Sequence, residues 1–250
     1  MSFHPAFSRA AGKAALLIVQ TGSTLPTLRA RHGDFPEWFR RGLGLRRDEV
    51  DVVVAERDAL PPAGTYAGVV VTGSPAMVSA RERWSEDAAA WLRGAIDADV
   101  PVLGVCYGHQ LLAHALGGRV DYHPAGREIG TVAIETLEAA AGDALLADAP
   151  ATFPAHSSHQ QSVLELPRGA TVLARSAHDP HHAVRYAPNA WGLQFHPEFS
   201  VEIMQGYIEA RRPALVGDCS IDCCNTRCSR PTPLARGLLR RFRAITNRSR

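Results

Sequence analysis

Four short apolar runs in the first half of the chain constrain its fold more than any other feature. They are rich in β-branched residues, they are bounded by Gly, Pro or polar residues, and they cover 16–19, 50–54, 68–71 and 102–105. Their hydrophobicity is continuous rather than alternating, which is typical of strands buried on both faces of a sheet. Between the last two runs, residues 84–98 show the apolar periodicity of a helix. Strand, helix and strand in this order predict a parallel sheet flanked by helices.

The pattern changes after Gly118. Shorter strand candidates, separated by loops rich in Pro, Gly, His and Asp, cover 131–134, 171–174, 183–186 and 191–195. They predict an antiparallel addition to the parallel core. Two helices are predicted beyond them, one over 201–211 and one marked by a narrow apolar stripe that consists of Leu234, Leu238, Phe242 and Ile245.

The length and composition are consistent with one main domain. The chain has 250 residues, of which 46% are hydrophobic, so it can bury one sizeable core. We expect an N-terminal extension over 1–13, the main domain over 14–212, and a Cys- and Arg-rich C-terminal extension with a helix over 213–250. The formal net charge is +2, but eight Arg residues lie after Cys224 in a stretch without acidic residues, so the rest of the chain is net acidic. An acidic body does not favour nucleic acid as the partner, although the tail could contact an acidic surface.

The distribution of the cysteines does not fit a disulfide framework, and it favours a cytoplasmic location. Cys106 is isolated, and the other four, Cys219, Cys223, Cys224 and Cys228, are crowded near the end. These four lack paired C-x-x-C knuckles, so we expect free thiols rather than a metal site. The run from His178 to His182 contains three His and one Asp around an Asp-Pro turn signal, and we interpret it as a polar loop. The apolar run near the N-terminus is too short to span a bilayer, so no membrane association is expected.

A candidate nucleophile lies between a buried strand and a helix. The segment Gly104-Val105-Cys106-Tyr107-Gly108 leaves the strand over 102–105 and opens a helix that ends at Gly117-Gly118. Glycines on both sides of Cys106 permit the tight turn of a nucleophile elbow, the G-x-S-x-G pattern of serine hydrolases with Cys in place of Ser. The positive end of the following helix favours the thiolate. A buried, inert cysteine is the alternative interpretation.

His196 is the best candidate for a base that activates Cys106. It follows the strand predicted over 191–195, and Glu198 is two positions further on, where a carboxylate can orient the ring. An oxyanion hole would need two backbone N–H groups. Tyr107 can supply one, and the turn Thr72-Gly73-Ser74-Pro75 at the end of another strand can supply the second.

Together these motifs resemble the class I glutamine amidotransferases, in particular the stand-alone relatives of the amidotransferase domain of GMP synthase. The likeness runs from about Leu16 to Phe199, and its strongest parts are Gly104 to Gln110, with Leu111 and the two glycines after the helix, and Gln194 to Glu198. The resemblance implies a flavodoxin-like α/β sheet and a glutamine-hydrolysing activity that needs no metal or cofactor.

The resemblance also implies roles for individual residues. Cys106, His196 and Glu198 would form a catalytic triad, and the amides of Ser74 and Tyr107 would form the oxyanion hole. The substrate would be held by Gly73, Gln110, Ser158 and His159. In the family a Ser-His-Gly-Asp loop contacts the glutamine backbone, whereas here Gln160 and Gln161 replace its Gly and Asp.

Three functions fit these residues. The first is an amidotransferase that passes ammonia to an acceptor on a separate synthetase chain, because no phosphate-binding or pyrophosphatase loop is present in the sequence. The second is a hydrolase of γ-glutamyl peptides or amines that uses the same residues, favoured by the altered loop. The third is a catalytically silent scaffold or regulatory partner that binds through the Arg-rich helix.

Overall fold

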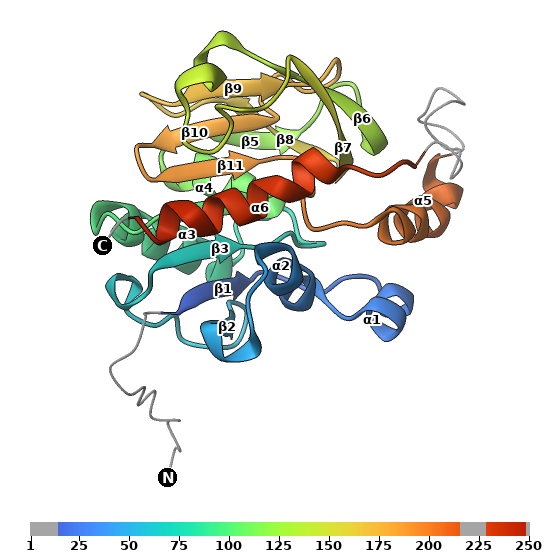
Figure 1. The fold of residues 1–250 in the computed structure, drawn as a ribbon. Coiled ribbons are helices and arrows are strands. Elements are labelled where there is room, and N and C mark those ends of the chain that lie inside the picture. The colour runs from blue at the N-terminus through green and yellow to red at the C-terminus, as the bar shows by residue number, and fades with distance from the viewer. Residues whose placement is uncertain (1–14, 216–228, 249–250) are drawn as a thin grey trace.

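The computed structural model describes residues 15–215 and 229–248. The predicted N-terminal extension over 1–13 and the cysteines from Cys219 to Cys228 lie outside the described residues. A nine-stranded sheet forms the centre of the described part (Figure 1). Its parallel half has the strand order β2 (Val50–Val54), β1 (Leu16–Gln20), β3 (Gly68–Val71), β4 (Val102–Val105), β11 (Ala190–Leu193). This is the 2-1-3-4-5 order of flavodoxin-like sheets, so the predicted fold class is confirmed.

An antiparallel half continues the same sheet beyond β11. It contains β10 (Ala183–Ala187), β9 (Thr171–Arg175), β6 (Glu128–Thr136) and β7 (Thr152–His159). A separate two-stranded ribbon pairs β5 (Arg119–Tyr122) with β8 (Gln161–Glu165). The strands β5, β7 and β8 were not predicted, because they are rich in polar residues such as His156 and Gln161 whose burial depends on tertiary contacts.

The expectation that the strand over 191–195 belongs to the antiparallel addition is wrong. The observed strand β11 pairs in parallel with β4, with Trp191 opposite Leu103, and pairs antiparallel only with β10. The strand is therefore the last member of the parallel core. As a result, the residues that follow β11 lie at the same edge of the sheet as those that follow β4.

Helices cover both faces of the parallel half. They are α1 (Pro26–His32), α2 (Phe35–Leu43), α3 (Arg83–Asp97), α4 (Tyr107–Ala115), α5 (Val201–Leu215) and α6 (Pro233–Thr246). Successive strand residues point to opposite faces, so Leu16 and Ile18 pack with α2 and α6, whereas Leu17 and Val19 pack with α3 and α4. Figure 1 shows α2 and α6 on one side of the sheet and α3 on the other.

The C-terminal helix α6 contributes to the core. Its apolar stripe buries Leu238, Leu239 and Phe242 against α2 and the sheet. Two of its arginines are held by the main body: Arg243 pairs with Glu49, and Arg241 pairs with Asp148. Part of the Arg-rich tail is therefore bound by the domain rather than free for a partner.

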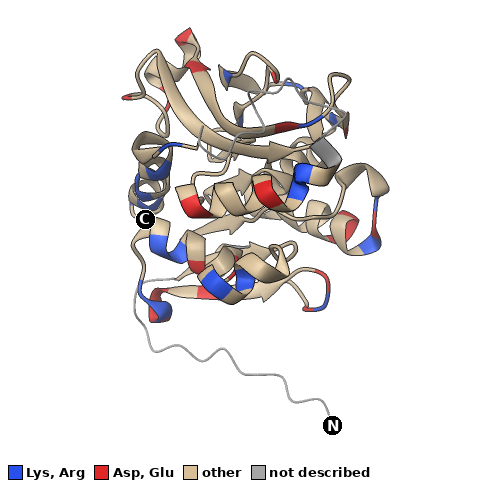
Figure 2. Cartoon of the chain, turned by 90° about the vertical axis from the view of Figure 1, so that its right-hand side faces the viewer, with Lys and Arg blue, Asp and Glu red and all other residues tan. Residues whose placement is uncertain are grey.

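Charged residues are distributed over the helices and loops. In the view of Figure 2, segments that carry Lys or Arg alternate with segments that carry Asp or Glu. Among the described residues, no helix combines the length and apolar character that crossing a membrane requires.

Candidate active site

Three loops that carry the predicted site residues meet at the carboxyl edge of the parallel strands. Cys106 follows β4, the turn with Gly73 and Ser74 follows β3, and His196 lies three residues after the end of β11. These three strands are neighbours in the sheet, with β4 in the middle. Open parallel sheets bind their ligands at this edge. Strand order therefore brings together residues that are far apart in the sequence.

The main chain of Cys106 has a conformation that L-residues rarely adopt, with φ 52° and ψ −104°. The flanking glycines make this turn possible because the backbone is crowded on both sides. A Cβ atom at Gly104 would lie 2.3 Å from the carbonyl oxygen of Gly108, and one at Gly108 would lie 2.4 Å from that of Val71. The turn is secured by a hydrogen bond from the Cys106 N–H to the Leu193 carbonyl, 2.8 Å long. These are the properties of a nucleophile elbow.

His196 is fixed from several sides. Its Nδ1 atom lies 2.7 Å from Oε1 of Glu198, and its ring stacks on Phe199 with centroids 4.0 Å apart. Its backbone N–H donates to the His156 carbonyl at 2.7 Å. The Cα of Gly73 lies so close to the ring that an added Cβ would be 3.1 Å from His196 Cε1. The ring can therefore turn very little, and its Nε2 is left for Cys106.

Cys106 and His196 favour an ion pair. Burial by itself raises the pKa of the Cys106 thiol, but the positive charge of His196 and its hydrogen bond to the thiol lower that pKa below the ordinary value. Burial lowers the pKa of His196, and the negative charges of Glu198 and Cys106 raise it by more, to about 10. Both shifts favour the pair of thiolate and imidazolium, the form in which cysteine is nucleophilic.

Two backbone amides have the properties that an oxyanion hole requires. Among the described residues, neither the Ser74 nor the Tyr107 N–H donates to another backbone or side-chain group. Tyr107 is the first residue of α4, so its N–H also lies at the positive end of that helix. The Tyr107 ring is held away from Cys106, stacked on Trp84 and hydrogen-bonded to Ser85 at 2.6 Å. Ser74 uses its hydroxyl as an acceptor for the Ala76 N–H.

The predicted substrate-binding residues are more deeply buried than a surface loop would be. Gln110 uses both N–H bonds of its side chain within the protein, one to the Gln161 carbonyl at 2.6 Å and one to Gln194 Oε1 at 3.0 Å. His159 ends β7 and is buried, and the Ser158 hydroxyl is buried without a partner among the described residues. Gln161, which stands where the family has Asp, binds Ser79 with both atoms of its amide group.

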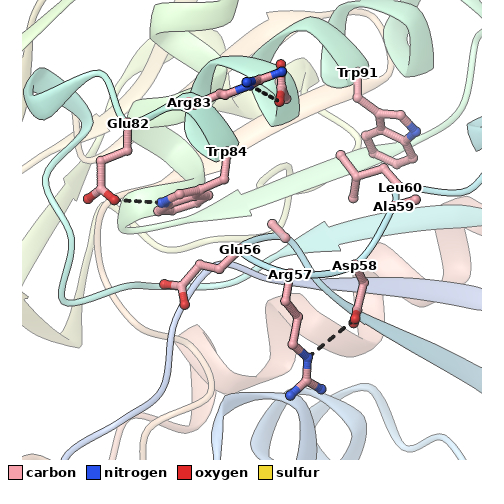
Figure 3. Close-up of a pocket in the computed structure, with 11 residues that line it drawn as sticks. Glu56, Arg57, Asp58, Ala59, Leu60, Glu82, Arg83, Trp84 and Trp91 are labelled. Atoms are coloured by element: carbon pink, nitrogen blue, oxygen red, sulfur yellow. Dashed lines mark hydrogen bonds and ion pairs between the residues drawn. The ribbon is translucent and has the colours of Figure 1, made fainter.

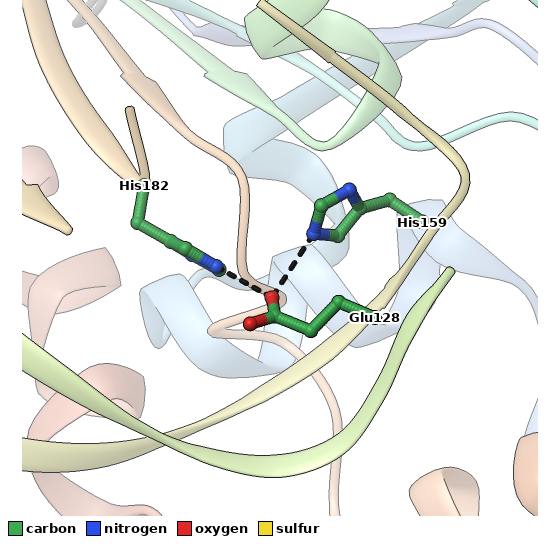
Figure 4. A group of neighbouring side chains, drawn as sticks. All are labelled: Glu128, His159 and His182. Carbon is green, nitrogen blue, oxygen red and sulfur yellow. Dashed lines mark hydrogen bonds and ion pairs between the residues drawn. The ribbon is translucent and has the colours of Figure 1, made fainter. Parts of the chain in front are cut away.

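Sequence reasoning missed a buried carboxylate beside these residues. Oε2 of Glu128 lies 3.0 Å from His159 Nε2 and 2.6 Å from His182 Nε2 (Figure 4). The run from His178 to His182 is a turn, as expected, but Asp179 and His182 are fully buried rather than exposed. No local pattern could have revealed this cluster, because Glu128 and His182 are 54 residues apart.

An open cavity lies on the same edge of the sheet but is not lined by the elbow. Its volume is about 790 Å³, and it is an open hollow between the loop after β2 and the start of α3, with Trp84 and Trp91 on one side (Figure 3). Trp84 is the link between this cavity and the elbow, because its ring stacks on Tyr107. The candidate active site is therefore defined by Cys106 and His196 and not by this cavity.

The fold and the site define an α/β protein with a cysteine on a nucleophile elbow and a paired histidine and glutamate. The family model for glutamine amidotransferase class-I matches residues 32–211. The chain belongs to the class I glutamine amidotransferase family, a family of glutamine-hydrolysing amidotransferases.

Relatives in the family include proteins named GMP synthase [glutamine-hydrolyzing]. The one from Thermomicrobium roseum is 42% identical over 132 residues, which cover 52% of this chain and 23% of the relative. The one from Synechococcus sp. strain CC9311 is 34% identical over 187 residues, which cover 74% of this chain and 32% of the relative. This chain therefore spans only about a quarter to a third of the length of these curated relatives.

Solved structures have the same fold. A glutamine amidotransferase from Thermotoga maritima superposes with a TM-score of 0.74 at 21% identity, covering 95% of this chain and 100% of its own. A glutamine amido transferase from Methylobacillus flagellatus gives a TM-score of 0.70 at 22% identity, covering 95% of this chain and 94% of its own.

Proposed function

We propose that this chain hydrolyses the side-chain amide of glutamine through a γ-glutamyl thioester on Cys106 and releases ammonia. The observation that carries the proposal is the geometry around the thiol of Cys106. Cys106 occupies a strained elbow above the parallel sheet, and His196, oriented by Glu198 at 2.7 Å, faces it. Membership in the class I glutamine amidotransferase family supports the same substrate.

In the first half-reaction the Cys106 thiolate attacks the γ-carboxamide carbon, and the carbonyl π electrons move to oxygen. The N–H groups of Ser74 and Tyr107 would donate to that oxyanion, where preorganised donors are worth about 2.7–4 kcal/mol each. His196, already an imidazolium, then gives its proton to the nitrogen as the C–N bond breaks. Ammonia leaves, and the thioester remains on Cys106.

In the second half-reaction His196 is neutral and acts as a base. It takes a proton from water while the water oxygen attacks the thioester carbon, and the same two amides hold the new oxyanion. Collapse of this intermediate breaks the C–S bond, so glutamate leaves and Cys106 returns as the thiolate beside the imidazolium. Glu198 serves both halves, because it keeps the ring in one orientation and stabilises its charged form.

The substrate's amino acid end would lie toward Gly73, Gln110, Ser158 and His159. Only the oxygen of the Gln110 side chain is left to meet a substrate ammonium, since both of its N–H bonds are used internally. The partnerless Ser158 hydroxyl is a further candidate donor. The sequence contains no phosphate-binding or pyrophosphatase loop, and relatives are named GMP synthase, so we propose that the ammonia acceptor is a separate synthetase chain. The isolated Cys106 and the absence of a disulfide pattern in the sequence support the cytoplasm as the compartment.

The proposal is tested by trapping the nucleophile with 6-diazo-5-oxo-L-norleucine, a glutamine analogue whose electrophilic carbon replaces the amide. We expect mass spectrometry to find one adduct, on Cys106, and we expect added glutamine to slow its formation. The Cys106→Ala variant is the matched control and should not react. If the wild type forms no adduct, or if glutamine gives no protection, the glutamine amidase function is wrong.

A second candidate function is hydrolysis of γ-glutamyl peptides or amines. The observation in its favour is Gln161, which stands where the family has Asp and whose amide group binds Ser79 rather than pointing to solvent. Ammonia release from glutamine and cleavage of a γ-glutamyl dipeptide should be measured under the same conditions. A clear preference for the dipeptide would replace the first function by the second, and both would proceed through Cys106.

A further inference from the structure

Glu128 is the centre of a buried, hydrogen-bonded cluster, and its carboxylate has no role in the reaction described above. Its Oε2 accepts from Ser157 at 2.8 Å, from His159 at 3.0 Å and from His182 at 2.6 Å, and its Oε1 accepts from Ser176 at 2.7 Å. The two His rings converge on one carboxylate oxygen (Figure 4). Although burial opposes it, the electrostatic interaction with His182 and the hydrogen bonds from both rings hold the pKa of Glu128 well below its usual range. Glu128 is therefore an anion that can only accept hydrogen bonds.

The hydrogen-bond partners of His159 determine its protonation state. Its Nε2 faces the Glu128 carboxylate at 3.0 Å, and its Nδ1 faces the Gln161 carbonyl oxygen at 3.0 Å. Both partners are acceptors, so both ring nitrogens must carry hydrogen. The Ser162 hydroxyl could donate to Nδ1, but it lies further away, at 3.3 Å, and would leave the closer carbonyl facing a lone pair. Burial lowers the pKa of His159, and the hydrogen bond and charge of Glu128 raise it by more.

His159 is connected to the helix that carries Cys106. The Gln161 carbonyl oxygen accepts from His159 Nδ1 and from the side chain of Gln110, one on each lone pair. Gln110 lies one helical turn after Cys106 and donates its backbone N–H to the Cys106 carbonyl at 3.0 Å. A positive charge on His159 lowers the pKa of Cys106, and the negative charge of Cys106 raises the pKa of His159.

We propose that Glu128 and the Gln161 carbonyl hold His159 as a permanent imidazolium, and that its fixed positive charge is a second support for the Cys106 thiolate besides His196. His159 is then a positioning residue, and its partner Glu128 determines its charge. The proposal rests on the proposed role of Cys106 as nucleophile, but it concerns the charge state of the site and not the substrate. Other ionisable groups around His159 are Asp179, His178, His123 and His109.

A divalent metal is the competing interpretation, because two His and one Glu could bind one. Their nitrogen and oxygen atoms lie within 4.8 Å of one another. However, the N–O separations of 2.6 and 3.0 Å are hydrogen-bond lengths, whereas ligands about 2.1 Å from a tetrahedral zinc lie roughly 3.4 Å apart. Four donors also satisfy the carboxylate already. Hydrogen bonds therefore explain the arrangement of these three side chains better than a bound metal ion does.

The test measures the ionisation of Cys106 without requiring turnover. The rate of Cys106 alkylation by iodoacetamide should be followed from pH 5 to 10 in the wild type and in Glu128→Gln and His159→Gln chains. Both variants remove the charge of the cluster, so we expect alkylation at pH 6 to slow by roughly 3- to 10-fold and the profile to move to higher pH. Glu135→Gln is the matched control, because it makes the same change in the same strand at an exposed carboxylate paired with Arg175.

Two further measurements keep the test decisive if a variant is unstable. In the folded wild type, nitrogen-15 NMR of labelled histidines should show both ring nitrogens of His159 protonated from pH 6 to 8. Zinc titration should show no stoichiometric binding that depends on Glu128. A neutral His159, an unshifted alkylation profile in folded variants, or one zinc bound per chain through Glu128 would each overturn the proposal. An enzyme without glutaminase activity but with the shifted profile would contradict the proposed function alone.

Discussion

The backbone at Cys106 predicts an unusual response to glycine. With φ 52° and ψ −104°, the residue is in a region that costs a non-glycine residue about 1–3 kcal/mol, and glycine is free of that cost. Replacing Cys106 by Ala keeps the cost, and replacing it by Gly removes it. Both changes delete the thiol equally, so the comparison between them depends only on the backbone and on one buried methyl group.

An Ala-to-Gly change at Ala113, about two helical turns further along, serves as the reference. Ala113 lies inside α4 with helical backbone and is fully buried, as Cys106 nearly is. There, Ala to Gly costs about 0.5–1 kcal/mol for backbone freedom and roughly 0.8 kcal/mol for a buried methyl group. At position 106 the same two losses are offset by the relief of strain. We therefore expect the Ala-to-Gly change to be about 2 kcal/mol more favourable at 106 than at 113.

Urea unfolding followed by circular dichroism measures this difference. Three chains are needed, Cys106→Ala, Cys106→Gly, and Cys106→Ala combined with Ala113→Gly. We expect the first two to have similar free energies of unfolding, with the glycine chain equal or higher, and the third to be lower than the first by more than 1 kcal/mol. If glycine costs as much at 106 as at 113, the elbow stores no strain and this reasoning is refuted.

Three further predictions follow from the packing and charges. Phe242→Ala should lower the free energy of unfolding by about 3–5 kcal/mol, because α6 is part of the core. Arg240→Ala, on the exposed face of α6, should change it by less than about 0.5 kcal/mol. Equal small effects of the two changes in urea unfolding would mean that α6 does not stabilise the core. Gly73→Ala should slow glutamine hydrolysis roughly tenfold with little loss of stability, because its Cβ would lie 3.1 Å from His196 Cε1; an unchanged rate would contradict this. Wild-type Cys106 should be alkylated rapidly below the ordinary thiol pKa and lose reactivity only as pH falls through its lowered pKa. The His196→Gln change removes the largest effect that opposes burial, so it should move the profile to higher pH; overlapping profiles would refute the ion pair.

Local sequence was sufficient for the nucleophile elbow. Gly104 acts within a few residues, since it prevents a clash of a Cβ with the Gly108 carbonyl, whereas Gly108 makes room for Val71 on the neighbouring strand. The elbow was nevertheless visible locally, because glycines flank Cys106 between an apolar strand and a helix. His196 and Glu198 could be paired from the sequence for the same reason, because two positions along one turn are sufficient for their contact.

The buried polar cluster could not be predicted in this way. Glu128, His159 and His182 come from three segments whose composition indicates exposed loops or edge strands. The residues are buried because β6, β7 and the turn before β10 pack together, and a charge is tolerated there only because its partners arrive from the other segments. Such a cluster depends on long-range contacts that leave no periodic signal.

The sequence by itself determined the α/β class, the elbow at Cys106 and its histidine and glutamate. These features follow from hydrophobic periodicity and short motifs, which depend on residues close together in the sequence. Only the tertiary structure decided that β11 is parallel to β4, which brings His196 to the edge where Cys106 lies. It also decided that α6 belongs to the core and that His159 lies between two acceptors. The physical reason is the same in each case: strand order, helix docking and buried charge depend on partners distant in the chain, and these partners meet only in the folded protein.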